Sequence, residues 1–303
     1  MWPLSARAGQ LVDLANEIPA VGLTAKWMLG ECAASAWCRV ESAMNRYLEA
    51  LLGLNFAALR RGVQEGPRAL GRASLAAYIA ARLDDDRRQA LIREQLNQIP
   101  VVPLTDLLGD RKCLIKLHVM KYEDGILPYR DALALLSILV AEQPAQVLEI
   151  GTYMGHTARA MAENLERSTN HTVDLPPDFS AEKDAGNLPP KDDFHLIARR
   201  IVGREFKGQS LDSRIVQHLG DTAMVDFTKI GQPTFFFIDG SHTYEYCKND
   251  SEKCLALCPQ GGTFLWHDCD EMHAGVIKFI LDWRALGRNL VRIEETQLAY
   301  WKS

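Results

Sequence analysis

Two apolar runs in the second half of the sequence end in residues that can bind metal ions. Residues 235–238 are followed by Asp239, and residues 263–266 are followed by His267 and Asp268. If both runs are neighbouring buried strands of a parallel sheet, the side chains that follow them emerge at the same edge. Carboxylate and imidazole groups are common ligands of divalent cations. The pattern predicts a metal site formed by Asp239, His267 and Asp268; alternatively, His267 and Asp268 hydrogen-bond each other and cap the following turn.

A histidine three residues after Asp239 is the candidate general base. A histidine side chain can be present as a free base near neutral pH, so a residue of this type at position 242 can accept a proton. Alternatively, His242 has a structural role in a turn that caps a helix beginning at Tyr244. Asp250 falls inside that helix, where we expect it to face solvent. His273 is a weaker candidate for contact with a substrate.

The segment from Val147 to Gly155 has the pattern of a strand, a turn and the start of a helix. It reads Val-Leu-Glu-Ile-Gly-Thr-Tyr-Met-Gly, and its glycines, Gly151 and Gly155, allow positive φ and close approach of a ligand to the backbone. In an open α/β sheet, such a turn forms the floor of a site for a nucleotide-like cofactor. The dinucleotide fingerprint has a glycine where this chain has Tyr153. This difference argues against an NAD-binding oxidoreductase, which stays as an alternative.

Acidic residues also follow the second and third predicted strands. Asp174 ends the second strand, where an acidic side chain can accept hydrogen bonds from ribose hydroxyls. Asp221 follows Gly220 at the end of the third strand. Asp174, taken alone, is equally compatible with a solvated turn. Three successive strand ends with acidic or glycine-rich turns favour a ligand site.

A sheet must bring these strand ends together. From about residue 125, short apolar runs alternate with helix-like segments, which is typical of a parallel sheet covered on both faces. We predict helices at 133–140 and 156–165, and strands at 146–150, 171–174, 214–219, 234–239, 262–267, 290–293 and 297–301. The last two strands are close in sequence and should form an antiparallel hairpin. The predicted fold class is α/β, with a Rossmann-like, seven-stranded, mostly parallel sheet.

The first hundred residues have a different pattern. Residues 1–98 are rich in Ala, Leu and Arg, have apolar residues at helical spacing, and include a predicted helix over 83–96. Pro100 and Pro103 mark a boundary. We therefore predict a helical N-terminal segment at 1–98, a connector at 99–124 and an α/β domain at 125–303. Within that domain, the proline-containing stretch at 175–210 is expected to be a lid or a mobile insertion.

Composition excludes several classes of partner. The chain has 34 basic and 39 acidic residues, a formal net charge of -5 and no basic run, which argues against a nucleic-acid partner. Its seven cysteines form no CxxC pair, so we expect reduced thiols and a cytoplasmic protein. No run of about 18 apolar residues exists, so we expect no integral membrane segment. A small-molecule substrate fits this composition, and the helical N-terminal segment is compatible with a homo-oligomer.

The ordered motifs resemble those of class I S-adenosylmethionine-dependent methyltransferases. The Glu-Ile-Gly-Thr-Tyr-Met-Gly form is similar to that of the metal-dependent O-methyltransferases of the catechol, caffeoyl-CoA and macrolide-sugar types, and the resemblance covers roughly residues 125–303. The resemblance implies that Asp174 holds the ribose of the cofactor and that Asp221 lies near the adenine. The methionine part would lie against the turn after the first strand. The implied cofactor-binding residues are Glu149, Gly151, Tyr153, Gly155, Asp174 and Asp221.

The resemblance also implies a divalent cation that holds the substrate hydroxyl at Asp239, His267 and Asp268. The family more often has a carboxylate where this chain has His267. Magnesium prefers oxygen ligands, whereas imidazole suits softer ions. The expected cation is magnesium or manganese, with iron and zinc as alternatives if His267 is a ligand. The expected catalytic residues are His242 and Asp239, because His242 stands where catechol-type relatives have a catalytic lysine.

The expected function is methyl transfer from S-adenosylmethionine to a hydroxyl of a small molecule, assisted by a divalent cation. The Ile-Asp-Gly-Ser-His and His-Asp motifs look closer to the sugar-modifying branch, so a sugar or a secondary metabolite is the first guess for the acceptor. A non-catalytic scaffold protein with this fold is a second alternative. Four carboxylates on one sheet edge disfavour it, because a scaffold has no physical need for Glu149, Asp174, Asp239 and Asp268 there.

Overall fold

The structure is a computed structural model that describes residues 84–117, 125–179, 197–198 and 200–303. The chain divides into two compact units, Met1–Asp86 and Arg87–Ser303. Most of the predicted helical segment at 1–98 lies outside the described residues, but residues 84–96 form a helix, as the sequence predicts. Residues 180–196 and 199, half of the predicted insertion at 175–210, also lie outside the described residues.

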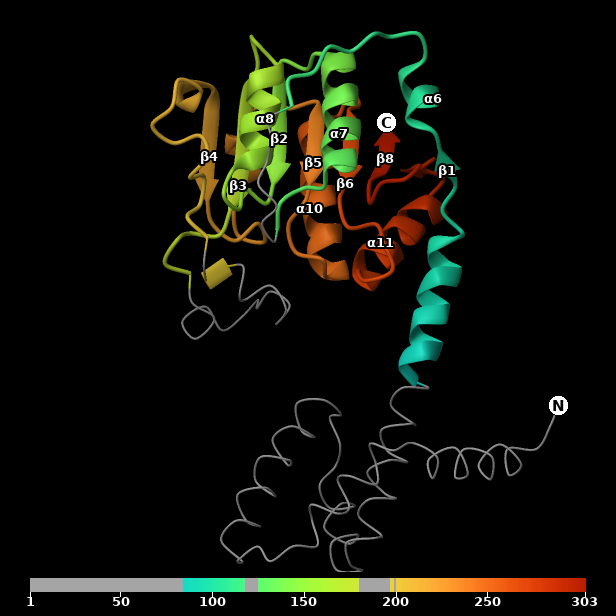
Figure 1. Cartoon of the computed structure of the whole chain (residues 1–303). Coiled ribbons are helices and arrows are strands. Elements are labelled where there is room, and N and C mark those ends of the chain that lie inside the picture. The colour runs from blue at the N-terminus through green and yellow to red at the C-terminus, as the bar shows by residue number, and fades with distance from the viewer. Residues whose placement is uncertain (1–83, 118–124, 180–196, 199) are drawn as a thin grey trace, which may run out of the picture. The chain divides into compact units, whose positions relative to one another are not determined.

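The second unit is built on one eight-stranded sheet with the strand order β1-β7-β8-β6-β5-β2-β3-β4 (Figure 1). β8 runs antiparallel to its neighbours β6 and β7, and all other pairs are parallel. The predicted fold class and the C-terminal antiparallel hairpin are confirmed. The strands are β1 Val101–Val102, β2 Gln146–Ile150, β3 Thr169–Asp174, β4 Ile215–Leu219, β5 Phe235–Ile238, β6 Thr263–Trp266, β7 Val291–Ile293 and β8 Ala299–Lys302.

The sheet has one strand more than the seven that the sequence predicts. The additional strand, β1, pairs in parallel with β7, and its first residue lies opposite Arg292. The backbone N–H of Arg292 donates to the carbonyl of Pro100 over 2.7 Å, and that of Glu294 donates to Val102 over 2.9 Å. Two valines between prolines lack the longer alternating run that marks a strand in a sequence, and proline is found at sheet edges. The predicted count of seven was therefore wrong by this edge strand.

Helices cover both faces of the sheet (Figure 1). α7 and α8 pack against each other on one face, and α10 and α11 pack against each other on the other face. The short helix α6 contacts α7. The helices are α6 Leu104–Leu108, α7 Tyr129–Glu142, α8 His156–Asn164, α10 Tyr244–Leu257 and α11 Ala274–Ala285, and the 3-10 turns are η2 Asp212–Arg214 and η3 Phe227–Lys229.

The two central strands β5 and β6 are buried on both faces, which explains their continuous apolar sequences. Successive side chains of a strand point to opposite faces. Phe236 accordingly packs with residues of α10 and α11, whereas Phe235 and Phe237 pack with residues of α7. The first polar side chains after these strands are Asp239 and His267, at the point where each strand leaves the core.

The strand order places β2 between β3, the next strand in the chain, and β5, which follows only after β4 at the sheet edge. Ligand sites of open α/β sheets form at this switch point, beyond the carboxyl ends of the strands. The turns after β2, β3, β5 and β6 therefore lie along one edge. These are the turns that the sequence predicts to carry the chemistry.

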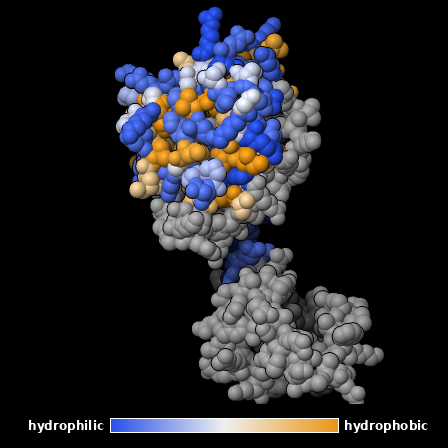
Figure 2. Space-filling view, turned by 90° about the vertical axis from the view of Figure 1, so that its left-hand side faces the viewer, coloured by the Kyte–Doolittle hydropathy of each residue, from blue (hydrophilic) through white to orange (hydrophobic). Residues whose placement is uncertain are grey.

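The surface of the second unit mixes polar and apolar residues. β4 is an edge strand, and Val216 and Leu219 on it are 39% and 47% exposed. Figure 2 views the molecule from the side on which β4 lies in Figure 1, and apolar surface there is interleaved with polar surface. Within the described residues, no helix is both long and apolar enough to span a bilayer.

Candidate functional site

The turn between β2 and α8 has a backbone conformation that requires its two glycines. Gly151 has φ +97°, and a Cβ there would lie 2.0 Å from the carbonyl oxygen of Asp239. Gly155 has φ +91° and caps the N-terminus of α8, and a Cβ there would lie 2.7 Å from the ring of Phe206. The predicted cofactor turn thus abuts the backbone at the end of β5. Only a residue without a side chain permits this close approach.

Two other predicted site residues adopt positive φ although they are not glycines. Tyr153 has φ +49° and Asp268 has φ +58°. Left-handed backbone is uncommon for non-glycine residues, and it persists only where the surroundings hold it in place. The backbone N–H of Tyr153 donates to Asp174 Oδ2 over 2.6 Å, which fixes the turn to the end of β3. The cofactor turn and the cation cluster therefore both contain a constrained residue.

Glu149 lies at the carboxyl end of β2 and is fully buried. Its Oε2 accepts a hydrogen bond of 2.5 Å from the hydroxyl of Thr172, which is itself 2.6 Å from the hydroxyl of Thr152. Burial raises the pKa of Glu149 well above its usual value, and the nearby carboxylates Asp239 and Asp174 raise it further, against the effect of Thr172. Its burial behind the turn thus favours the neutral form of Glu149.

Asp174, predicted to hold the ribose, ends β3 and is paired with an arginine that the sequence analysis did not single out. Arg200 Nη2 lies 3.2 Å from Asp174 Oδ1 and also donates to the carbonyl of Leu175 over 3.1 Å. Burial raises the pKa of Asp174, whereas Arg200 and the N–H of Tyr153 lower it. Asp174 is therefore anchored on two sides, and no local sequence signal connects it to Arg200.

Asp221, predicted to lie near the adenine, follows β4 and is held by its own turn. Its Oδ1 accepts from the backbone N–H of Ala223 over 2.8 Å, and the hydroxyl of Tyr246 lies 3.0 Å from both carboxylate oxygens. Burial, followed by this hydrogen bond, raises the pKa of Tyr246, so its hydroxyl stays a donor. Lys253 donates to the carbonyls of Thr222 and Ala223, which fixes the turn further.

The three predicted cation ligands converge beyond β5 and β6. His267 Nδ1 lies 3.1 Å from Asp239 Oδ1 and 3.2 Å from Asp268 Oδ1, and one donor atom of each residue lies within 4.8 Å of the others. Adjacent ligand atoms of an octahedral ion are roughly 3 Å apart when each lies about 2.1 Å from the ion. The spacing of these donors therefore fits a small divalent cation.

The charges in this cluster point the same way. Burial lowers the pKa of His267, but the charge of Asp239 and hydrogen bonds to Asp131, Asp239 and Asp268 outweigh burial and hold the pKa well above its usual value. Burial raises the pKa of Asp268, but hydrogen bonds from His242 and His267 bring it well below its usual value. The carboxylates thus favour a positive charge among them. That charge can be a proton on His267 or a metal ion.

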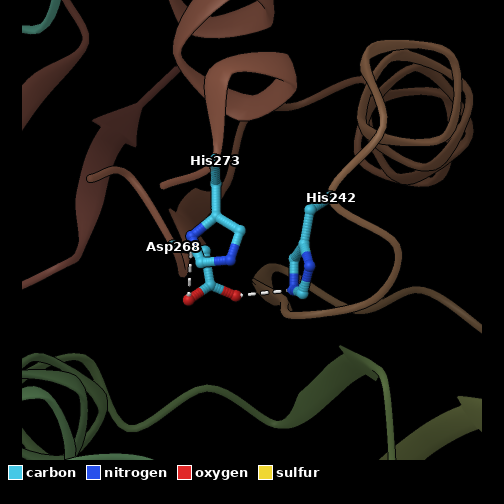
Figure 3. A group of neighbouring side chains, drawn as sticks. All are labelled: His242, Asp268 and His273. Carbon is cyan, nitrogen blue, oxygen red and sulfur yellow. Dashed lines mark ion pairs between the residues drawn. The ribbon is translucent and has the colours of Figure 1, made fainter. Parts of the chain in front are cut away.

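A second group of side chains adjoins the first through Asp268 (Figure 3). His242 Nε2 lies 2.7 Å from Asp268 Oδ2, on the side of the carboxylate that faces away from His267. His273 Nδ1 lies 3.6 Å from Asp268 Oδ1 and 2.9 Å from Asp270 Oδ1, and its ring centroid is 4.4 Å from that of His242. The two oxygens of Asp268 therefore connect the predicted base with the predicted cation ligands.

One sequence expectation fails at this site and several residues were missed. Asp250 does not face solvent: it lies on the buried side of α10 and is only 1% exposed. Two residues of the site were not predicted. Asp131, in the first turn of α7, places its Oδ2 3.0 Å from His267 Nε2. Gln297, in the turn before β8, donates its backbone N–H to Asp131 Oδ1. An acidic residue in the first turn of a helix usually complements the helix dipole, so the sequence pattern around Asp131 indicated no ligand role.

The strand order and the turn after β2 define the class of protein. The mostly parallel sheet, its antiparallel last strand and the glycine-containing turn after β2 agree with the resemblance seen in the sequence. A family model described as a methyltransferase domain matches residues 148–269. The matched segment runs from within β2 to just beyond β6, so the chain contains a methyltransferase domain. The match begins within β2 and ends beyond the predicted cation ligands.

Solved structures of methyltransferases are similar to this chain in fold. The methyltransferase PaMTH1 of Podospora anserina, with bound S-adenosylhomocysteine, is 15% identical with a TM-score of 0.42, and the match covers 73% of this chain and 96% of that chain. An O-methyltransferase from Bacillus cereus in complex with S-adenosylhomocysteine is 14% identical with a TM-score of 0.40, and the match covers 60% of this chain and 84% of that chain. TomG of Streptomyces achromogenes, an O-methyltransferase involved in tomaymycin synthesis, is 14% identical with a TM-score of 0.39, and the match covers 59% of this chain and 82% of that chain. No curated protein matches the sequence.

Proposed function

We propose that the protein transfers the methyl group of S-adenosylmethionine to a hydroxyl of a small molecule, with a divalent cation held by Asp239, His267 and Asp268. The observation that carries the proposal is the position of Asp268 between two groups. Its Oδ1 faces His267 over 3.2 Å, and its Oδ2 faces His242 over 2.7 Å. A hydroxyl held at the cation site would thus lie close to a histidine that can take its proton.

The residues of the cofactor side have positioning roles in this reaction. The sulfonium of S-adenosylmethionine supplies a reactive methyl group, so the protein mainly has to align donor and acceptor. Gly151 and Gly155 let the turn pack directly against the end of β5 and against the ring of Phe206. Asp174, at the end of the neighbouring strand, is the proposed acceptor for the ribose hydroxyls, and Asp221 is the proposed neighbour of the adenine.

The residues of the acceptor side raise the nucleophilicity of the hydroxyl. A divalent cation supplies Lewis acidity, which lowers the pKa of an acceptor hydroxyl. His242 takes the proton, and Asp268 orients the imidazole and stabilises the charge that the ring acquires. We propose a sugar hydroxyl or a secondary-metabolite hydroxyl as the acceptor, on the similarity of the Asp239 to His242 segment and the His267-Asp268 pair to the sugar-modifying branch.

Calorimetric titration of the full chain with S-adenosylhomocysteine and with NAD tests the donor. We expect binding of S-adenosylhomocysteine and none of NAD, because Tyr153 stands where a dinucleotide site needs glycine. Transfer of a labelled methyl group to a panel of glycosides and phenols, before and after chelation and with metal added back, tests the acceptor and the cation. Tight NAD binding without S-adenosylhomocysteine binding would exclude the proposal, and turnover that survives exhaustive chelation would exclude the cation.

A further inference from the structure

We infer that the cation centre takes a first-row transition metal in preference to magnesium, and that Asp131 is the positioning residue that makes His267 a ligand. This inference rests on the proposed function, because it concerns the cation of the same site. His267 lies between two sets of carboxylates. Its Nδ1 faces Asp239 and Asp268, and its Nε2 faces Asp131 Oδ2 over 3.0 Å.

Asp131 is placed to fix the tautomer of His267. A neutral imidazole has one N–H and one lone pair, and the partner of the N–H decides which nitrogen binds a metal. When His267 is neutral and its Nε2–H donates to Asp131, the lone pair is on Nδ1, which points at the two predicted ligand carboxylates. A carboxylate on the outer nitrogen of a metal-binding histidine also makes the ring a stronger ligand. His267 therefore has the hydrogen-bond partner that a ligand requires.

Asp131 is itself held from a third part of the fold. It lies on α7, is 2% exposed, and its Oδ1 accepts from the backbone N–H of Gln297 over 3.3 Å. The carbonyl of Gln297 accepts from the N–H of Cys269, directly after the ligand pair, and its side-chain amide donates to Asp270 over 2.8 Å. The segment around Gln297 thus locks both the outer carboxylate and the chain that follows the ligands. Such rigidity keeps donor atoms at fixed spacing.

The donor set decides the class of metal. Magnesium is held by oxygen atoms in a near-octahedral shell and keeps several waters. Imidazole binds better to softer divalent ions such as iron, cobalt, nickel and zinc. A centre with one imidazole and two carboxylates, in which the imidazole is oriented by Asp131, favours the transition metals. Replacing His267 by aspartate would give an all-oxygen set and remove the partner of Asp131.

Metal binding by the stripped full chain tests the inference without measuring turnover. We expect one Co2+ per chain, a visible ligand-field spectrum that changes in His267→Asp, and Co2+ or Zn2+ affinity well above Mg2+ affinity. Asp131→Asn should weaken Co2+ binding about 10-fold and Asp131→Ala up to about 100-fold, which is the usual effect of losing an outer partner. Asp282→Asn, on the exposed ion pair with Lys278, is the matched control and should leave Co2+ binding unchanged.

A double-mutant cycle separates a positioning role from a structural one. In the His267→Asp background, Asp131→Asn should no longer weaken Co2+ binding, because its partner is gone. Three results would each overturn the inference. They are an unchanged effect of Asp131→Asn in that background, binding of Mg2+ to the wild type that is equal to or tighter than Co2+ binding, and no metal binding at all. The last result would mean that a proton on His267 supplies the positive charge. Titration of the same samples with S-adenosylhomocysteine tests the methyl donor independently, so failure of the proposed function is distinguishable.

Discussion

The carboxyl group of Asp250 provides a prediction whose magnitude follows from its burial. Asp250 lies on α10, is 1% exposed, and its Oδ1 accepts from the side chain of Asn249 over 2.8 Å. Burial raises its pKa from 3.8 to about 6, against hydrogen bonds from Thr222 and Asn249 that lower it. The folded protein therefore binds this proton more tightly than the unfolded chain does. The resulting stabilisation is complete below the unfolded pKa and is lost as pH rises through the folded pKa.

The substitution Asp250→Asn removes the charge and keeps the shape of the side chain. A pKa difference of about two units corresponds to ~3 kcal/mol of unfolding free energy, at about 1.4 kcal/mol per unit. Above pH 6, where wild-type Asp250 is ionised in both states, the variant should be more stable than the wild type by up to ~3 kcal/mol. Near pH 4 or below, where the folded wild type is protonated, the two proteins should have nearly the same stability.

Urea denaturation followed by circular dichroism, at a series of pH values from about 4 to 8, measures this difference. The matched control is Asp282→Asn, since Asp282 is an exposed residue paired with Lys278 and should change stability only slightly at any pH. A stability difference for Asp250→Asn that is independent of pH would refute the assignment of a buried, proton-binding carboxyl. If the variant is less stable than the wild type at high pH, the ionised carboxylate of Asp250 is stabilised by its partners in the folded protein rather than destabilised by burial.

Three further changes test other parts of the fold and the site. Asp268→Ala should abolish metal-stimulated turnover while S-adenosylhomocysteine affinity, measured by calorimetry, changes by less than about 2-fold; unchanged turnover would remove the cation from the reaction. Gly151→Ala should destabilise the fold by about 1–3 kcal/mol in thermal melts and weaken cofactor binding, because its Cβ would lie 2.0 Å from the carbonyl of Asp239; wild-type values would contradict that packing. The ring nitrogens of His171 and His218 lie 3.2 Å apart, and burial lowers the pKa of both from 6.5. The free energy of unfolding should therefore fall as pH drops below about 6.5, and His218→Gln should reduce this loss. An unaltered pH profile of stability in His218→Gln would contradict this assignment.

The parts of the site that follow buried strands could be predicted from the sequence. A strand buried on both faces has a continuous apolar sequence, so its first polar residue marks where the chain enters the ligand edge. Asp239 and His267 were predicted in this way, whereas Asp174 was predicted as the acidic residue that ends the second strand. The parallel order of these strands places all three at one edge. The glycines of the cofactor turn carry an equally local signal, because positive φ selects glycine.

The residues that support this edge from elsewhere could not be predicted in the same way. Asp131 reaches His267 from a helix far earlier in the chain, and Gln297 of the C-terminal hairpin holds Asp131. Their positions depend on the packing of α7 and β8. Asp250 was wrongly expected to face solvent, because a charged residue in a helix is usually exposed and only the tertiary contacts bury it. Arg200 similarly meets Asp174 only in the folded chain.

The contact between Gly151 and Asp239 joins the proposed donor and acceptor sides, which lie on the adjacent strands β2 and β5. Methyl transfer requires the methyl group and the acceptor oxygen to be aligned within a short distance, and fixed geometry is the main source of rate in such a reaction. Gly151 belongs to the turn that would hold the donor, and Asp239 to the predicted cation site. Because β2 and β5 are hydrogen-bonded neighbours and the glycine lets their ends touch, one backbone contact sets the distance between the two sides. A side chain at Gly151 would separate them, so it should impair donor binding and cation binding together.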